Sequence, residues 1–346
     1  MAAAAPGSPE KNTRPGPKVA TIYDVAKMAG VNPSTVSRAF SKPGRVSAKT
    51  AGLIEEAAST LSYTPNPMAR ALPTGQTETL GLIIADITNP TYFEIVRGAQ
   101  TISSARGYTL VLAESAESAN TELKTAQRML ASVDGLILAG SRMDDTVILD
   151  LSSKKPLVVI NREVVGVPCV IPDVAKGVAE AIRHLAGNGH KKVAFVAGHP
   201  GSWMSAHRWD AVQSACEWSR LECVYVESSK STTNGGRDVA RAVLASGATA
   251  ILAYNDLLAI GLLQELQAGG VSVPDDISII GFDDLFGSDF TTPALTTVRS
   301  PLGRCGVAAT TRLLDLLNSS QATSVTLQME TELLLRGSSG KAATHA

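Results

Sequence analysis

Residues 21–40 read TIYDVAKMAGVNPSTVSRAF, and this stretch has the pattern of two short helices joined by a tight turn. Thr21 can cap a first helix, with Asp24 placed to complete a capping box. Gly30 follows where a helix must end, and glycine adopts the left-handed backbone needed there at little cost. Asn32 can cap a second helix, whose first residue is a proline that suits that position. The pattern predicts a helix-turn-helix.

The second of these helices, expected over residues 33–40, turns Val36 toward a core and polar side chains outward. In a helix-turn-helix this second helix enters the major groove of DNA. A third helix is expected from Ala48 to Leu61. An ordinary pair of short helices is the alternative interpretation, which the turn glycine and the polar outer face make less favoured.

The distribution of charge supports a nucleic-acid partner for this N-terminal part. The first 75 residues contain nine Lys or Arg against four Asp or Glu, a net charge of +5. The rest of the chain contains 22 against 28, a net charge of −6, although the whole chain sums to only −1. A basic head on an acidic body indicates a polyanion such as DNA as a partner of the head alone.

From Thr79 onward, short apolar runs alternate with segments of helical spacing, which is typical of an α/β fold with parallel sheets. A chain of 346 residues, 44% of them hydrophobic, is longer than one core usually serves, so two doubly wound halves are expected. A ligand in such a fold binds at the carboxyl ends of the strands, in the crevice between the halves. The expected strands are LGLIIA (80–85), YTLVLA (108–113), GLILAG (135–140), PLVVIN (156–161), KVAFVAG (192–198), TAILAY (249–254) and ISIIGF (277–282).

These patterns divide the chain into five expected parts. Residues 1–18 are rich in Ala, Pro and Gly without any period, which is typical of a disordered tail. Residues 65–78 hold prolines and polar residues and predict a linker with at most a short helix. The parts are 1–18 (disordered tail), 19–64 (helix-turn-helix domain), 65–78 (linker with at most a short helix), 79–336 (two-lobed α/β body) and 337–346 (flexible tail), with 79–160 and 291–320 in one lobe and 161–290 and 321–336 in the other.

Several other function classes find no support in the sequence. The four cysteines form no C-x-x-C pair and no histidine stands at a zinc-finger spacing, so we expect reduced thiols and no metal. The chain has no P-loop, H-E-x-x-H, G-x-S-x-G or complete G-x-G-x-x-G, so we expect neither an enzyme nor a cofactor. No stretch approaches ~20 uninterrupted apolar residues and the N-terminus lacks the apolar core of an export signal, so we expect a cytoplasmic protein with no membrane contact.

Several segments, taken in order along the chain, resemble one known family. TIYDVAKMAGVNPSTVSRAFSKPGRVSAKT resembles the headpiece of the lactose-repressor (LacI/GalR) family of bacterial transcription factors, and TPNPMARAL resembles its hinge helix. TLGLIIADITNPTYFEIVRGAQ, GHKKVAFVAG, AILAYNDLLAIGLLQELQAGGVSVPDDISIIGFDD and TTPALTTV resemble landmarks of its effector domain. The resemblance covers residues 19–336 and is therefore far more specific than a lone motif.

The resemblance implies a helix-turn-helix headpiece on a two-lobed body of the periplasmic-binding-protein type. It implies a ligand-responsive transcriptional regulator, a repressor, that binds a near-palindromic operator in double-stranded DNA as a homodimer. A small polar effector such as a sugar or sugar derivative would bind between the lobes and change the affinity for DNA. No C-terminal heptad helix is evident, so we expect no tetramer. A solute-binding transport receptor shares the body fold and is the alternative, but it would have no use for the head.

The resemblance also nominates residues that contact the operator. Arg38 is the best candidate for bidentate recognition of guanine, with a phosphate contact as the alternative. Pro33 cannot donate to a base and can offer only an apolar contact. The positions carried over from the headpiece are Asn32, Pro33, Ser34, Thr35, Ser37 and Arg38.

The hinge helix expected over residues 66–72 is too short to be stable alone, and in the family it forms on DNA, in the minor groove. Leu72 corresponds to the family's leucine wedge, which enters a base step, and a surface leucine of the linker is the alternative. Pro73 departs from many relatives and disfavours a helical residue before it, so a short hinge is expected. The candidate contacts are Asn66, Ala69, Arg70 and Leu72.

In the body, matching positions nominate Arg208, Asn255 and Asp283, whose planar polar groups suit a polyhydroxylated effector. Each has a structural alternative: a surface salt bridge for Arg208, and a helix cap for Asn255 and for Asp283. Tyr92 could form an apolar wall with its neighbour, and Trp203 could stack on a sugar. The candidate effector-binding residues are Tyr92, Phe93, Arg162, Trp203, Arg208, Asn255 and Asp283.

Overall fold

The computed structural model describes residues 20–41, 44–64, 76–318 and 325–343, and it divides into two compact units, residues 1–77 and 78–346. The first unit is helical in its described part. The second holds two six-stranded sheets with helices on their faces. Within the described ranges, no helix is long and apolar enough to cross a membrane.

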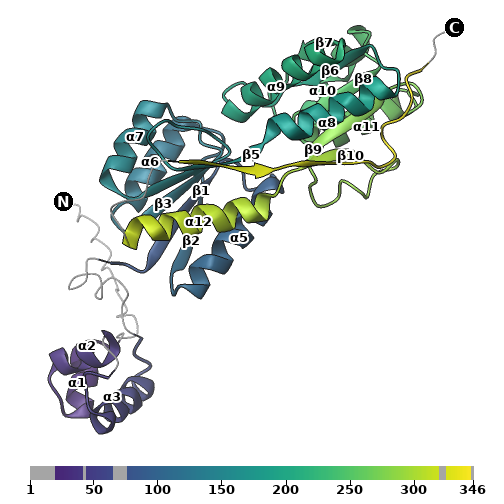
Figure 1. The fold of residues 1–346 in the computed structure, drawn as a ribbon. Helices are drawn as coiled ribbons and strands as arrows, with labels where there is room; N and C mark the ends of the chain where they lie inside the picture. Colours follow the sequence, from purple (N-terminus) through teal and green to yellow (C-terminus); the bar gives the residue numbers. More distant parts are fainter. Residues whose placement is uncertain (1–19, 42–43, 65–75, 319–324, 344–346) are drawn as a thin grey trace, which may run out of the picture. The chain divides into compact units, whose positions relative to one another are not determined.

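The first unit is a three-helix head whose caps match the sequence pattern (Figure 1). Asp24 accepts hydrogen bonds from the backbone nitrogen and the hydroxyl of Thr21, at 2.8 and 2.7 Å, which fixes the start of the first helix. Gly30 has a φ of 66°, the left-handed conformation that ends it. The predicted helix-turn-helix is confirmed. Its helices are α1 (Ile22–Ala29), α2 (Pro33–Ser41) and α3 (Ala48–Thr60).

A small apolar core holds the head together. Val25, Val36 and Ile54 come one from each helix, and all three side chains are fully buried. Val36 is therefore the residue that fixes the orientation of α2, as the sequence pattern predicts. The opposite face of α2 is left for a partner.

The second unit has two lobes, each built around one sheet. In the first lobe the strand order is β11-β5-β4-β3-β1-β2, and all neighbouring strands are parallel. Helices α5 and α12 pack on one face, and α6 and α7 on the other (Figure 1). The strands are β1 (Thr79–Ile84), β2 (Thr109–Glu114), β3 (Gly135–Ala139), β4 (Leu157–Ile160), β5 (Cys169–Asp173) and β11 (Thr326–Glu330). The helices are α5 (Thr91–Ala105), α6 (Ala119–Met129), α7 (Asp145–Lys154) and α12 (Leu302–Asn318).

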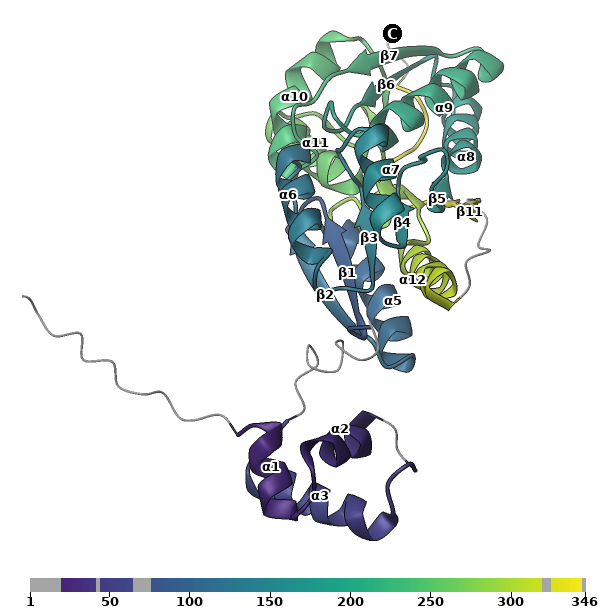
Figure 2. The same cartoon turned by 90° about the vertical axis from the view of Figure 1, so that its left-hand side faces the viewer.

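The second lobe repeats this plan with the strand order β12-β10-β9-β8-β6-β7, in which β12 alone runs antiparallel to its neighbour. Helices α10 and α11 lie on one side of the sheet, and α8 and α9 on the other (Figure 2). The strands are β6 (Lys192–Val196), β7 (Glu222–Val226), β8 (Ala250–Ala253), β9 (Ser278–Asp283), β10 (Thr296–Arg299) and β12 (Glu332–Leu334). The helices are α8 (Val174–Gly187), α9 (Trp203–Ser219), α10 (Thr233–Ala245) and α11 (Asp256–Ala268).

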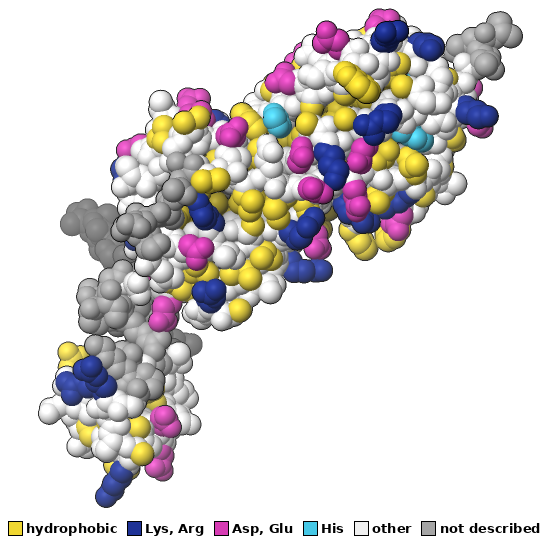
Figure 3. Space-filling model, in the orientation of Figure 1, with side chains coloured by type: hydrophobic (Ala, Val, Ile, Leu, Met, Phe, Trp, Pro, Cys, Tyr) yellow, Lys and Arg dark blue, Asp and Glu magenta, His cyan; other side chains and the backbone are white. Residues whose placement is uncertain are grey.

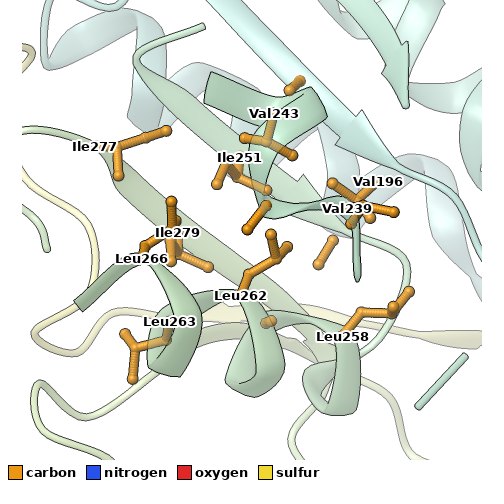
Figure 4. Close-up of a cluster of buried hydrophobic side chains, with 14 of the residues drawn as sticks. Val196, Val239, Val243, Ile251, Leu258, Leu262, Leu263, Leu266, Ile277 and Ile279 are labelled. Carbon is orange, nitrogen blue, oxygen red and sulfur yellow. The ribbon is translucent and has the colours of Figure 1, made fainter. Parts of the chain in front are cut away.

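The core of the second lobe lies between α11 and the middle strands (Figure 4). Ile251 of β8 and Ile279 of β9 are fully buried, as are Leu258 and Leu262 of α11. Each such side chain contributes about 1.5–3 kcal/mol by leaving water. This packing fixes the carboxyl ends of β8 and β9, where the polar residues of the interlobe cleft stand.

The crossovers between the lobes differ from the sequence prediction. They follow β5, β10 and β11, whereas the predicted lobe boundaries are near residues 160, 291 and 321. Strands β5 and β11 pair with each other in the first lobe, and β10 belongs to the second. Their sequences, CVIPD, TLQME and TTVR, contain prolines or polar residues in place of an apolar run, so periodicity alone does not reveal them. The lobe boundaries near residues 160, 291 and 321 were therefore wrong.

The C-terminal segment also differs from its prediction as a flexible tail over residues 337–346. Ser338 is fully buried, donates to the carbonyl oxygen of Ile279 at 2.6 Å and accepts from the backbone nitrogen of Thr296 at 2.8 Å. The backbone nitrogen of Gly340 donates to Ser278 at 3.0 Å. Small residues let this segment lie close against β9, so residues 337–343 belong to the second lobe.

Candidate functional site

The outer face of α2 carries the predicted DNA-contacting residues. Asn32, Ser34, Ser37 and Arg38 are exposed, and Pro33 and Thr35 are partly exposed. The carbonyl oxygen of Asn32 accepts from the backbone nitrogens of Thr35 and Val36, so that residue begins the helix. The arrangement gives a short polar ridge with one guanidinium, suited to the edges of bases in a major groove. The hinge candidates Asn66, Ala69, Arg70 and Leu72, with Pro73, lie outside the described residues.

A narrow cavity lies between the two lobes of the body, at the carboxyl ends of their strands. Its volume is about 20 Å³, close to the room that one water molecule needs. Four of the predicted effector residues line it, namely Tyr92, Arg208, Asn255 and Asp283. The other lining residues are Asn89, Thr91, Gly140, Arg142, Asn161, Ser202, Met204 and Tyr254. We call this the inner cavity.

Arg208 and Asp283 form a buried ion pair on the second-lobe side of the inner cavity. Nη2 of Arg208 lies 2.8 Å from Oδ1 of Asp283, and both side chains are about 95% buried. Nη1 donates to the carbonyl oxygen of Tyr254, and the guanidinium carbon lies 3.7 Å from the centre of the Phe282 ring. Burial rules out the alternative of a surface salt bridge for Arg208. Among the described residues, its buried Nε has no hydrogen-bond partner.

Asp283 stands at the end of β9 with a φ of 102°, a conformation that residues other than glycine rarely adopt. Such a backbone costs about 1–3 kcal/mol and is found most often at binding sites. Its carboxylate accepts from Arg208 and from the hydroxyl of Ser300 at 3.0 Å. It does not cap a helix, because turns and bends follow β9.

Asn255 is occupied by structural hydrogen bonds. Its Oδ1 accepts from the backbone nitrogen of Leu258 at 2.9 Å, and its Nδ2 donates to the carbonyl oxygen of Ser231 at 3.0 Å. The alternative role as the cap of α11 is therefore confirmed. The residue still lines the inner cavity, with one amide hydrogen left for a ligand.

Asp256 lies beside this cap and is fully buried. It accepts from the hydroxyl of Thr297 at 2.6 Å and from the backbone nitrogen of Leu285 at 2.8 Å. Burial raises the pKa of its carboxyl to about 8, although both hydrogen bonds oppose the shift. Asp256 joins α11 to β10 and to the segment after β9, so its role is structural.

An outer pocket of about 310 Å³ adjoins the inner cavity and shares Asn89 with it. It carries charges of both signs. Lys230 and His199 come from the second lobe, and Asp86 and Glu117 from the first. Its other lining residues are Ser229, Ser231 and Thr232.

Comparisons with known proteins bear on both sites. Residues 21–66 match the family model for bacterial regulatory proteins of the lacI family, and residues 182–339 match a periplasmic binding protein-like domain. The ribose operon repressor of Escherichia coli is 32% identical over 338 residues, which span 92% of this chain and 100% of that protein. The chain belongs to the lacI family. It is a DNA-binding transcriptional regulator, and its family is not enzymatic.

Other lacI-family relatives agree. The transcriptional repressor CytR of Escherichia coli is 30% identical over 92% of this chain and 96% of its own length. A structure of the lac repressor dimer bound to operator and the anti-inducer ONPF has a TM-score of 0.84 and 26% identity, over 93% of this chain and 100% of that chain. A regulator from Enterococcus faecium with bound ribose has a TM-score of 0.69 and 27% identity, over 76% of this chain and 98% of that chain. A transport receptor is therefore excluded as the identity of this chain.

Three predicted effector residues of this lacI-family protein lie away from the inner cavity. Phe93 is half exposed on the outer side of α5, because a residue next to the inward Tyr92 is rotated by about 100° around the helix. Trp203 packs against the core of the second lobe and stacks on His207, with ring centres 4.7 Å apart. Arg162 lies in neither pocket. These three predictions therefore find no support in the geometry.

The guanidinium of Arg162 has a structural role instead. It donates to the carbonyl oxygens of Ser141 and Met143, at 3.2 and 2.5 Å, and pairs with Asp145 at 2.7 Å. It therefore fixes the loop between β3 and α7. The sequence alone could not show that these two carbonyl oxygens accept hydrogen bonds from the guanidinium of Arg162.

Eight lining residues of the inner cavity are absent from the predicted effector set, Arg142 and Tyr254 among them. Arg142 follows β3, is nearly buried, and donates to Glu117 at 2.6 Å and to the carbonyl oxygen of Gly140 at 2.8 Å. Tyr254 follows β8, and its hydroxyl lies 3.2 Å from that of Ser202. Tyr254 ends the predicted strand 249–254 and Arg142 lies two residues beyond the predicted strand 135–140, so the rule that ligands bind at the carboxyl ends of strands points to both.

A separate groove of about 420 Å³ lies between α12 and β11, on the face of the first lobe where Figure 3 shows hydrophobic side chains gathered. Val325 and Leu327 are half exposed there, beside Ala308. This groove shares no residue with the inner cavity or the outer pocket. It is therefore not a part of the effector site.

Proposed function

We propose that this protein is a dimeric repressor that binds a near-palindromic operator through two heads and changes its operator affinity when a small polyhydroxylated molecule enters the cleft. The single observation that carries the effector half of this proposal is the buried pair of Arg208 and Asp283 at the cavity wall. A guanidinium and a carboxylate held side by side suit the vicinal hydroxyls of a sugar.

The balance of charge in the cleft favours an uncharged effector. Arg208 is paired with Asp283, and Arg142 with Glu117, so each arginine of the inner cavity is already neutralised by a carboxylate. A ligand charge brought into the inner cavity would meet arginines that are already paired and would lose its hydration. The relatives with bound ribose and with cellobiose agree with a sugar or a sugar-containing molecule.

For the DNA half, the exposed face of α2 supports contact with a major groove. Arg38 would read guanine, and Ser34 would approach the neighbouring base. The hinge would enter the minor groove with Leu72 as its wedge, as in the resemblance on which this rests. The protein would act on DNA in the cytoplasm.

A dimer follows from two half-sites, and the body offers an apolar surface for it. Phe286 and Phe290 are 82% and 69% exposed and pack edge to face, with ring centres 5.1 Å apart. Phe286 and Phe93 also border a groove of about 700 Å³. Exposed aromatic clusters of this kind mark contact surfaces. A second copy would cover them across a two-fold axis.

One experiment in two stages tests the proposal. An operator is first selected from random duplex DNA with the full chain, and its affinity is then measured by fluorescence anisotropy with D-ribose, D-galactose, cellobiose and adenosine in turn. A ligand at a thousand times its dissociation constant adds about 4 kcal/mol of stability, so thermal shift identifies the binder first. The proposal requires that a ligand that raises the melting temperature also changes operator affinity. A binder that leaves operator affinity unchanged would refute ligand control.

A further inference from the structure

The carboxylate of Asp283 is met by three side chains from three different parts of the body. Arg208 approaches Oδ1 from α9 of the second lobe at 2.8 Å. Ser300, which directly follows β10 in the crossover, donates to the same oxygen at 3.0 Å. Thr91, the first residue of α5 in the first lobe, donates to Oδ2 at 3.4 Å. Asp283 is therefore a junction between both lobes and the chain that joins them.

The two oxygens of Asp283 are used unequally. A carboxylate has about four acceptor sites, and the two bonds on Oδ1 are of ordinary length. Among the described residues, the contact with Thr91 is the one hydrogen bond on Oδ2. At 3.4 Å it is longer than the roughly 2.5–3.0 Å of a well-formed O–H···O bond. The bond from Thr91 is therefore a weak one, which a better-placed hydroxyl can replace.

The ion pair and Thr91 border the same space. Arg208 and Asp283 both line the inner cavity. A ligand hydroxyl there can donate to Oδ2 as the hydroxyl of Thr91 does. Thr91 also lines this cavity and is 94% buried. Its hydroxyl meets Oδ2 from the lobe opposite to the ion pair.

We propose that Thr91 is a positioning residue whose hydroxyl occupies Oδ2 of Asp283 in the place of an effector hydroxyl and so holds the two lobes together. The effector hydroxyl then displaces Thr91 from Oδ2 and takes over the link to the second lobe. This inference rests on the proposed function, in that the displacing molecule is the hydroxyl-bearing effector. The contact between Thr91 and Asp283 itself needs no effector.

The contact has a consequence for regulation. An effector shifts a two-state protein only by its difference in affinity for the two states. Thr91 holds the two lobes together even without an effector. It therefore reduces the difference in operator affinity between the protein with effector and the protein without it. Removal of this hydroxyl should widen the effector's influence on operator affinity, whether the effector strengthens or weakens binding.

Three variants of the full chain test the contact by hydrogen exchange without added ligand. Thr91→Val keeps the shape and removes the hydroxyl, Thr91→Ser keeps the hydroxyl, and Thr101→Val removes an exposed hydroxyl from the same helix. One hydrogen bond corresponds to about a fivefold change in an opening equilibrium. We expect exchange in peptides from both walls, residues 86–95 and 199–208, to be about fivefold faster in Thr91→Val alone. Equal exchange in Thr91→Val and wild type would overturn the inference.

A second arm separates this inference from the proposed function. The ratio of operator dissociation constants with and without D-ribose or adenosine is measured for wild type and Thr91→Val. We expect the ratio to depart further from one in Thr91→Val, by about fivefold. If a ligand changes operator affinity by the same factor in wild type and in Thr91→Val, displacement of Thr91 is refuted. Ligand control of operator affinity then still stands. If no ligand changes the operator affinity of either protein, the proposed function is in question. The hydrogen-exchange rates still test the contact between Thr91 and Asp283.

Discussion

Nη2 of Arg208 and Oδ1 of Asp283 lie 2.8 Å apart, between a helix and a strand end that are 75 residues distant in the chain. The pair sits over the Phe282 ring and faces the inner cavity. Both partners are buried, so the geometry is held by packing as well as by charge. This makes the pair at once a structural part of the second lobe and the polar wall of the cleft.

Replacement of Arg208 should separate these two roles. Arg208→Ala leaves a buried carboxylate unpaired, which costs about 3–5 kcal/mol, so a lower melting temperature is expected. Arg208→Lys keeps the charge but loses the planar guanidinium that bonds both Tyr254 and Asp283. It should abolish the ligand-induced thermal shift, while operator binding persists. Arg183→Lys, exposed on α8, serves as the matched control. A normal ligand shift in Arg208→Lys would contradict the assignment.

Arg38→Ala should weaken binding to the selected operator. Loss of a bidentate contact to guanine costs about 1–3 kcal/mol, which is roughly a tenfold to hundredfold loss of affinity, and relaxes sequence preference at one position of each half-site. Glu55→Gln, exposed on α3, should leave affinity within about twofold. Gel shifts with the operator and with random DNA check both. An equal loss on both DNAs would mean that Arg38 contacts phosphate.

Gly236 lies at a close contact between α10 and α11. A Cβ atom there would lie 2.2 Å from the carbonyl oxygen of Leu258 and 2.9 Å from the backbone nitrogen of Leu262. Gly236→Ala should therefore destabilise the body by about 1–3 kcal/mol or more, because backbone cannot yield as a side chain can. Gly187→Ala, in α8 with open space around it, should be neutral or stabilising by about 0.5–1 kcal/mol. Urea unfolding of the two variants measures both effects. Equal midpoints for Gly236→Ala and Gly187→Ala would contradict the prediction.

Asp256 predicts a pH dependence of stability. Burial raises its pKa in the folded protein to about 8, above the 3.8 of the free side chain. The folded state therefore holds a proton that the unfolded state releases, and the stability from this group is complete below pH ~4 and lost as pH rises toward 8. Asp283 and Asp284 add to the shift as neighbouring negative charges.

Asp256→Asn should remove this pH-dependent part of the stability, because an amide does not titrate. The amide can still form hydrogen bonds with Leu285 and Thr297. The difference in unfolding free energy between variant and wild type should change by up to about 1.4 kcal/mol per pH unit between pH 5 and 8, in favour of the variant at high pH. Asp275→Asn, exposed, is the control. A difference that does not vary with pH would show that Asp256 is charged throughout.

Much of the fold follows from the sequence, for stated reasons. The caps at Thr21 and Gly30 and the anchor Val36 are local features, so the head could be predicted closely. Six of the seven predicted strands are largely buried and leave a clear apolar pattern, whereas the edge strand β2 keeps apolar residues that are partly exposed. Strands β5, β10 and β11 are held by their neighbours more than by their own composition. Thr297 of β10, for instance, is buried because its hydroxyl meets Asp256.

The candidate site was predictable in part. Arg208 and Asp283 were found by resemblance, but their contact with each other and with Thr91 depends on three distant segments. Phe93 and Trp203 have suitable chemistry and point elsewhere, because helix phase at α5 and packing at α9 decide their direction. Residue type could suggest these side chains, and only the tertiary fold could orient them.

Selection of binding sites from random duplex DNA with the full-length protein, at about 150 mM salt, tests the central claim most directly. That claim is that the head reads a specific operator as one half of a symmetric pair. The account predicts enrichment of a near-palindrome with two half-sites, lost when Arg38→Ala replaces the wild-type chain. Recovery of DNA with no shared sequence, or of a single half-site without symmetry, would contradict it.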